Sequence, residues 1–133
     1  MTRPFYYKET QVIRITVRPK YLPHQSYPDA QRYVFAYFVR IENVSKQTLQ
    51  LRSRRWLIYD SIGEQHEVVG DGVVGEQPTL HPGDVHEYQS FSILKSSNGY
   101  MEGIYRFLGE DKTLLDAVIP RFDLQAKQPD VLL

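Results

Sequence analysis

The amino-acid sequence predicts an all-β domain, a sandwich of about seven or more antiparallel strands. Three observations predict this class. Apolar and polar residues alternate with period two along most of the chain. Turn-forming residues separate the alternating segments at regular intervals. The aromatic share is 13%, with ten tyrosines, and aromatic side chains suit a pleated, half-buried surface.

The first strong strand signal is the row Ile13, Ile15 and Val17, which alternates with polar residues and predicts one buried face. A second apolar row runs from Tyr33 to Ile41 at every other position, so one face of that strand is also expected in the core. Further strands are expected at residues 67–69, 85–94, 100–108 and 114–119.

The segment 49–59 breaks the simple alternation. Leu49 and Leu51 share one parity, whereas Trp56 and Ile58 have the other. Either both faces are buried, or a β-bulge between Leu51 and Trp56 changes the phase. We favour the bulge, and we expect Trp56 in the core, as a mid-strand tryptophan often is in β-sandwiches.

Turn chemistry marks the connections between these strands. Residues 43–47 and 61–63 read as hairpin loops, and the Pro82-Gly83 pair within 81–84 is a strong turn signal. Residues 19–30 read as a proline-punctuated loop. We expect one domain over residues 1–124, followed by a short, frayed C-terminal tail at 125–133.

Composition narrows the class of function. Lysine plus arginine balances aspartate plus glutamate, so the chain has no net basic charge of the kind that non-specific nucleic-acid binders use. There is no cysteine, which excludes disulfides and thiolate zinc sites. No apolar run reaches the ~20 residues of a membrane span, and the first eight residues hold no apolar signal core. We therefore expect a cytoplasmic protein without a nucleic-acid or membrane partner.

The segment 70–75 matches the dinucleotide motif G-x-G-x-x-G as a string. In that motif a helix must follow, with its N-terminus facing the pyrophosphate. Pro78, Pro82 and Gly83 follow instead, and prolines and glycine oppose a sustained helix. We therefore predict a shaped glycine loop with positive φ at some glycines rather than a dinucleotide site.

A different use of the same loop stays open. Successive backbone N–H groups can form an anion-binding nest without a helix. Arg52, Arg54 or Arg55 could then supply the countercharge, although exposed strand arginines often only solvate a face. This alternative predicts a small-anion binder for phosphate or pyrophosphate.

Residues for catalysis or for a metal are present but not ordered into a motif. The four histidines, His24, His66, His81 and His86, show no tight ligand spacing. Serine, histidine and aspartate occur without a nucleophile elbow. We predict no enzyme, no cofactor and no metal site.

Several segments taken in order resemble the ApaG family. The most specific are the run from Val69 to Pro78 and the run Met101-Glu102-Gly103. Others are Tyr21-Leu22-Pro23, Ile41-Glu42-Asn43 and Ile119-Pro120-Arg121-Phe122, so the likeness spans nearly the whole chain. One departure is Arg55, which stands where the family usually has histidine before the tryptophan.

The resemblance implies an immunoglobulin/fibronectin-III-like β-sandwich and a small bacterial protein of poorly defined role. It also implies a protein-interaction unit, because similar modules occur in eukaryotic F-box proteins and in a DNA-polymerase-delta-interacting protein. The family name carries an association with cobalt and magnesium tolerance, which would imply a weak role linked to divalent cations.

We predict a non-catalytic binding or adaptor module for an unidentified protein partner, and self-association is a further possibility. The recognition surface would be the glycine loop, the 19–30 loop or an exposed sheet edge. The candidate contact residues are Gly70, Gly72, Gly75, Glu76, Gln77 and Arg54.

Overall fold

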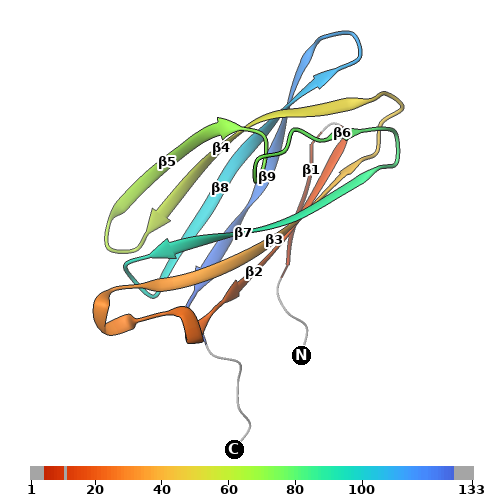
Figure 1. Ribbon diagram of the computed structural model, residues 1–133. Coiled ribbons are helices and arrows are strands. Elements are labelled where there is room, and N and C mark those ends of the chain that lie inside the picture. The colour runs from red at the N-terminus through yellow and green to blue at the C-terminus, as the bar shows by residue number, and fades with distance from the viewer. Residues whose placement is uncertain (1–4, 11, 128–133) are drawn as a thin grey trace, which may run out of the picture.

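The computed structural model describes residues 5–10 and 12–127, which form a β-sandwich of two antiparallel sheets (Figure 1). The first sheet has the order β1-β2-β3-β7. The second has the order β5-β4-β8-β9, with β6 paired to β4. Their bounds are β1 (Tyr6–Thr10), β2 (Ile13–Tyr21), β3 (Tyr33–Asn43), β4 (Leu49–Asp60), β5 (Glu64–Asp71), β6 (Thr79–Leu80), β7 (Val85–Leu94), β8 (Asn98–Gly109) and β9 (Leu114–Gln125).

The core lies between the sheets and confirms the predicted alternation. Ile13, Ile15 and Val17 of β2 are fully buried. Trp56 is also buried, with its ring centroid 5.6 Å from that of Tyr37 and 5.9 Å from that of Phe122. Edge-to-face aromatic pairs of this kind add to the burial of apolar area. Trp56 thus connects the two sheets.

The predicted bulge in β4 is confirmed. The register of β4 against β8 shifts between Leu51 and Ser53. Because side chains alternate along a strand, one extra residue moves all later side chains to the other face. Leu51 and Trp56 can therefore both face the core, and Arg54 takes the same inner row as Trp56.

Two connections differ from the expectation. Residues 43–47 do not form a hairpin, because β3 and β4 belong to different sheets. The side chain of Asn43 is buried there and donates to the carbonyls of Gln47 and Leu80. Turn residues indicate a change of direction, but long-range burial decides which sheet the chain enters.

The predicted 19–30 loop is wrong at its start. Strand β2 continues through Pro19 to Tyr21, and two short 3₁₀ turns follow at Pro23–Gln25 and Pro28–Ala30. These turns are the helical segments of the described residues, and neither is long or apolar enough to cross a membrane. At the other end, β9 includes Gln125, and residues 128–133 of the predicted tail lie outside the described residues.

Strands β1 and β6 were not predicted from the sequence. β6 has two residues, and its partner β4 is about 30 residues away, so no local pattern marks it. β1 carries Tyr6, whose ring packs 6.2 Å from that of Phe122. The backbone N–H of Val118 on β9 donates to the Thr10 hydroxyl, 3.1 Å away. These contacts join the two sheets along one side.

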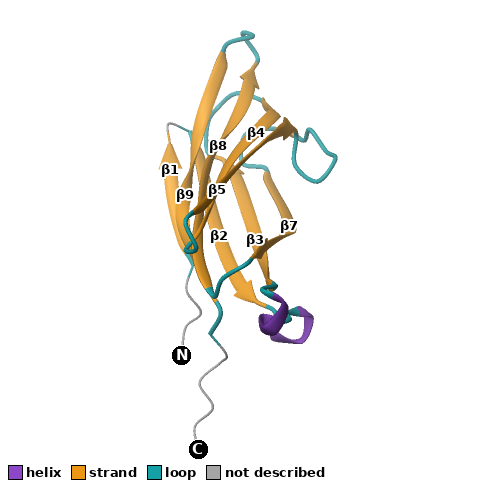
Figure 2. Ribbon diagram, turned by 90° about the vertical axis from the view of Figure 1, so that its left-hand side faces the viewer, coloured by secondary structure: helices purple, strands orange, loops and turns teal. Residues whose placement is uncertain are grey.

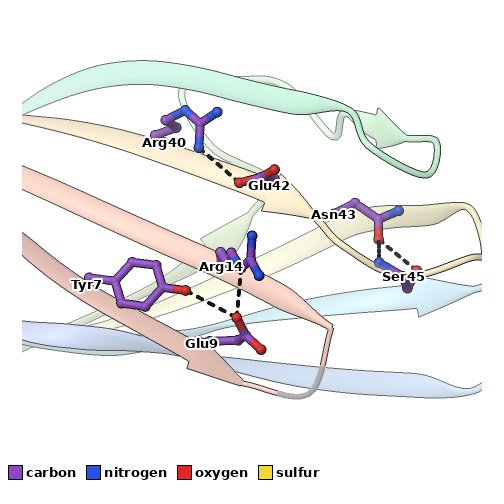
Figure 3. Close-up of polar contacts among 7 residues, drawn as sticks. All are labelled: Tyr7, Glu9, Arg14, Arg40, Glu42, Asn43 and Ser45. Atoms are coloured by element: carbon purple, nitrogen blue, oxygen red, sulfur yellow. Dashed lines mark hydrogen bonds and ion pairs between the residues drawn. The ribbon is translucent and has the colours of Figure 1, made fainter.

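On the opposite side, β5 and β7 are the last strands of their sheets, and Figure 2 shows β7 at the margin of the first sheet. The outer face of the first sheet is polar near β1, β2 and the end of β3 (Figure 3). There Arg14 pairs with Glu9 at 2.7 Å, and Arg40 pairs with Glu42 at 3.0 Å. Tyr7 donates a hydrogen bond to Glu9. Charged side chains therefore cover this end of the face.

Candidate functional site

The glycine-rich segment lies at the end of β5 and in the loop that leads to β6. Gly70 and Asp71 are the last residues of β5, so only Gly72 to Pro78 form the loop itself. No helix follows within residues 72–84, as the prolines predicted. The helix N-terminus that a dinucleotide site requires is thus missing from this segment.

Arg54 holds the start of this loop. Its Nη1 donates to the carbonyl oxygens of Asp71 and Gly72, at 2.9 and 3.0 Å. Arg54 lies opposite Gly70 in the β4–β5 register. A Cβ added at Gly70 would come within 2.9 Å of the Arg54 guanidinium. Gly70 therefore leaves the space across which this guanidinium lies.

The middle of the loop is a tight turn closed by two backbone hydrogen bonds. Val73 donates to the Glu76 carbonyl at 2.8 Å, and Glu76 donates to the Val73 carbonyl at 3.0 Å. Gly72 has φ of 63°, and its N–H donates to the Arg52 carbonyl at 2.9 Å. The side chain of Val73 is 1% exposed and packs into the core. The loop is thus fixed to the sandwich at its centre.

Gln77 fixes the far end of the loop. Its Nε2 donates to the Arg52 carbonyl, 2.8 Å away. Gln50 donates in turn to the Gln77 carbonyl at 3.3 Å, and the N–H of Leu51 donates to the Pro78 carbonyl at 3.0 Å. The bulge in β4 makes this possible, because Arg52 lies at the register shift, where its carbonyl accepts from both Gly72 and Gln77.

The structure thus gathers the six candidate residues around one loop: Gly72, Gly75, Glu76 and Gln77 within it, Gly70 at the end of β5, and Arg54 on β4. Two of the six have structural roles that the sequence did not indicate. Gly70 has no positive φ and is instead required by the Arg54 guanidinium. Arg54 points to the loop carbonyls rather than outward. Arg55, by contrast, is on the outer face, is 61% exposed and pairs with Glu67 at 2.9 Å.

The tip of the loop is exposed and strained. Val74 has φ of 47° and is 62% exposed, and Gly75 has φ of 78°. A β-branched residue in the left-handed region is a true conformational outlier. The Glu76 side chain beside it is 68% exposed. Val74 and Glu76 are therefore the side chains that the loop presents to an approaching molecule.

Two neighbouring groups were missed from the sequence because no local pattern links them to the loop. His86 of β7 places its Nε2 3.7 Å from the Glu76 carboxylate. Tyr88 of β7 and Tyr105 of β8 share a hydrogen bond between their hydroxyls. Burial raises the pKa of both phenols well above the ordinary value of 10.0, while the positive charge of Arg54 opposes the rise. The charge of Arg54 thus acts on the buried tyrosine pair as well as on the loop carbonyls.

The geometry limits what the loop can offer an anion. Gly72, Val73 and Glu76 already donate their N–H groups within the protein. The N–H groups of Val74, Gly75 and Gln77 are left for an outside ligand, and only the first two are adjacent. Arg54 Nη1 is occupied by two carbonyls. A nest requires several convergent N–H groups, so this loop is poorly suited to phosphate or pyrophosphate.

The described residues contain no group of three or more histidine, aspartate or glutamate side chains positioned to hold a metal ion. Two open hollows of about 300 and 310 Å³ lie on the outer faces of the sheets, away from the glycine loop. One lies over Gly103, and the other lies between Arg18, Phe38 and Gln89. None of the six candidate residues lines either hollow, although Tyr88 lines the second.

Comparisons with known proteins agree on one family. The family model described as the ApaG domain matches residues 23–109. "Protein ApaG" of Rhodospirillum centenum is 46% identical over 121 residues, which are 91% of this chain and 93% of that protein. "Protein ApaG" of Anaeromyxobacter dehalogenans is 49% identical over 115 residues, 86% of this chain and 90% of that one.

A solved structure supports the same assignment. The putative ApaA protein from Bordetella pertussis superposes with a TM-score of 0.84 at 40% identity. The superposition covers 93% of this chain and 98% of that one. The β-sandwich and the family resemblance predicted from the sequence are both confirmed.

Proposed function

We propose, from the premise that the chain belongs to the ApaG domain family, that it is a non-catalytic protein-binding module. Its recognition surface is the tip of the glycine loop, with Val74 and Glu76 as the contacting side chains. The partner is a protein rather than a small molecule, because the tip exposes an apolar side chain at Val74 and an acidic one at Glu76.

The observation that supports this proposal is the conformation of Val74. A β-branched residue at φ of 47° costs of order 1 to 3 kcal/mol. The exposed side chain of Val74 returns little of that cost through burial in the sandwich. Strained residues that surrounding structure over-determines cluster at functional sites. The loop therefore holds Val74 in place for contact with another molecule.

The construction of the loop also favours binding. The loop is attached to the sandwich at its start by Arg54, at its centre by the buried Val73 and at its end by Gln77. A segment that is already ordered loses little conformational entropy when a partner docks. Loops displayed on a rigid scaffold are a common form of recognition surface.

The proposal is tested by affinity capture with matched variants. Tagged wild-type protein is used to isolate partners from a bacterial cytosol, and each captured protein is purified and titrated. Val74→Asp should abolish binding, because it places a charge at the centre of the apolar contact. Ile62→Asp is the control, since Ile62 is 48% exposed in the β4–β5 turn, far from the loop along β5. A partner that binds both variants equally contradicts the proposal.

The small-anion alternative is separated by calorimetry of the wild-type protein with pyrophosphate and nucleotides. The internal hydrogen bonds of the loop lead us to expect no heat of binding at roughly millimolar ligand. Binding that shifts the amide signals of Val74 and Gly75 in a nuclear magnetic resonance titration would instead assign the loop to an anion. Arg54→Ala alone is not decisive, because it also removes the support of the Asp71 and Gly72 carbonyls.

A further inference from the structure

Strand β7 has the features of a pairing edge. It is the last strand of the first sheet, and its ten register pairs with β3 run without a shift. Natural edge strands are usually protected by lysine, proline or a bulge. Residues 85–94 contain no lysine, arginine or proline, and Glu87 is their only acidic residue. The edge of β7 is therefore long, regular and nearly uncharged.

An apolar surface lies beside this edge on the outer face of the first sheet. Phe91 is 54% exposed, Ile93 is 50% exposed and Phe38 is 40% exposed. In the β3–β7 register, Phe91 lies opposite Ala36, and Phe38 lies opposite Gln89. These three side chains form one apolar patch over β3 and β7. It contrasts with the charged end of the same face at Arg14 and Glu9 (Figure 3).

We propose that the occupant of this edge is a second copy of the chain, with β7 paired antiparallel to β7 across a two-fold axis at Phe91. Such an interface is self-complementary, because each contact occurs twice. The axis at Phe91 sets the two Phe91 rings against each other. It also sets Gln89 of each copy opposite Ile93 of the other.

Charge complementarity selects this register. With the axis at Phe91, Glu87 of one copy lies opposite Lys95 of the other, and the pair occurs twice. An axis at Gln89 would place Glu87 opposite Phe91, and an axis at Glu87 would oppose the two carboxylates. Opposite charges across a strand pair stabilise it, and like charges destabilise it.

Lys95 directly follows β7, so the pairing must extend one residue past the end of the strand to bring it opposite Glu87. Its backbone N–H donates to the Asp60 carboxylate of β4, and its side chain is 57% exposed. Its Nζ lies 3.1 Å from Glu64 of its own chain, so in the dimer it would bridge two carboxylates. On the inner face, the same register pairs Ser90 with Ser92 and Tyr88 with Leu94, without opposing like charges.

The dimer would join the two first sheets into one continuous sheet across the molecules. The proposed register runs from Glu87 to Lys95, whereas the glycine loop approaches β7 at His86, through Glu76. The pairing uses no residue of the loop, so this proposal does not depend on the proposed function. If both hold, the dimer presents two recognition loops, and a partner with two sites would bind with raised avidity.

The test is sedimentation of the full chain over a range of protein concentrations. The wild type should show a monomer–dimer equilibrium. Phe91→Lys should leave only monomer, because it places two lysines against each other at the axis. The control is Val69→Lys on the β5 edge, where Val69 is 65% exposed, and it should dimerise like the wild type.

Charge reversal tests the register. Glu87→Lys and Lys95→Glu should each weaken the dimer by roughly fivefold or more, since two exposed ion pairs are lost. The double variant should recover part of the lost affinity, because the charges at positions 87 and 95 exchange places while the attraction between position 95 and Glu64 is lost. A wild type that stays monomeric at roughly millimolar concentration overturns the proposal. So does a dimer that survives Phe91→Lys, or one that Val69→Lys dissociates.

Discussion

Replacement of Gly72 by alanine tests whether the glycine loop is held by the contacts described above. Gly72 has φ of 63°, a conformation that costs an L-residue about 1 to 2 kcal/mol. The new Cβ would also lie 2.1 Å from the Glu76 carbonyl oxygen. That oxygen must move, which breaks the hydrogen bond from Val73 and costs about 1 to 2 kcal/mol more. We expect a loss of about 2 to 4 kcal/mol in the free energy of unfolding.

Gly75→Ala provides the comparison. Gly75 has φ of 78°, but a Cβ there would meet no atom within 4 Å. Only the backbone strain remains, partly offset by the lower entropy of the unfolded chain, so the expected loss is about 1 kcal/mol. Gly63→Ala in the β4–β5 turn is a second control, with φ of 98° and equally open space.

The assay is chemical denaturation of the three variants together with calorimetry. For a chain of this length, 1 kcal/mol corresponds to roughly 4 °C in Tm. Gly72→Ala should therefore lower Tm by roughly 8 to 16 °C, and the two controls by roughly 4 °C each. If all three variants lose the same stability, backbone strain alone explains the loop, and the contact with the Glu76 carbonyl is not a constraint.

Two other predictions concern the surroundings of the loop. Val74→Gly should leave the free energy of unfolding unchanged or raise it by up to about 1 kcal/mol, because it relieves the strain of φ 47° while glycine adds entropy to the unfolded chain. Chemical denaturation measures this change. A loss of several kcal/mol would contradict the prediction. The pKa values of Tyr88 and Tyr105 are raised in the folded state, which favours the protonated phenols there. The stabilisation from these two phenols is therefore complete below pH 10, and it is lost as the pH rises from 10 towards the folded pKa values. Denaturation at increasing pH should show this decline, and it should be smaller in the variant Tyr88→Phe/Tyr105→Phe, whereas equal slopes would contradict the burial of the pair.

The fold class followed from local patterns that physical chemistry ties to a strand. Ile13, Ile15 and Val17 alternate because one face of β2 packs on the core. The change of parity between Leu51 and Trp56 located the bulge, because only an extra residue lets both face inward. The burial of Asn43 between two sheets could not be predicted, since the turn residues around it do not encode which sheet the chain enters next. β6 could not be predicted, because a strand of two residues is too short to show an alternation of apolar and polar residues.

The candidate site was found in part. The glycines of the loop stand out in the sequence because positive φ and close backbone approach favour glycine, and the prolines after them ruled out a helix. Gly72 and Gly75 confirm the expected positive φ. The strained Val74 gave no signal, because valine is not a residue from which a left-handed conformation is expected.

The sequence by itself determined the β-sandwich, the position of the bulge and the absence of a helix after the glycine loop. Each of these depends on residues close together in the chain. Only the tertiary structure decided that Arg54 binds the loop carbonyls, that His86 and the tyrosine pair lie near it, and that β7 is an apolar edge. These features join residues of β3, β4, β5, β7 and β8, and contacts between distant segments depend on how the sheets pack rather than on any local pattern.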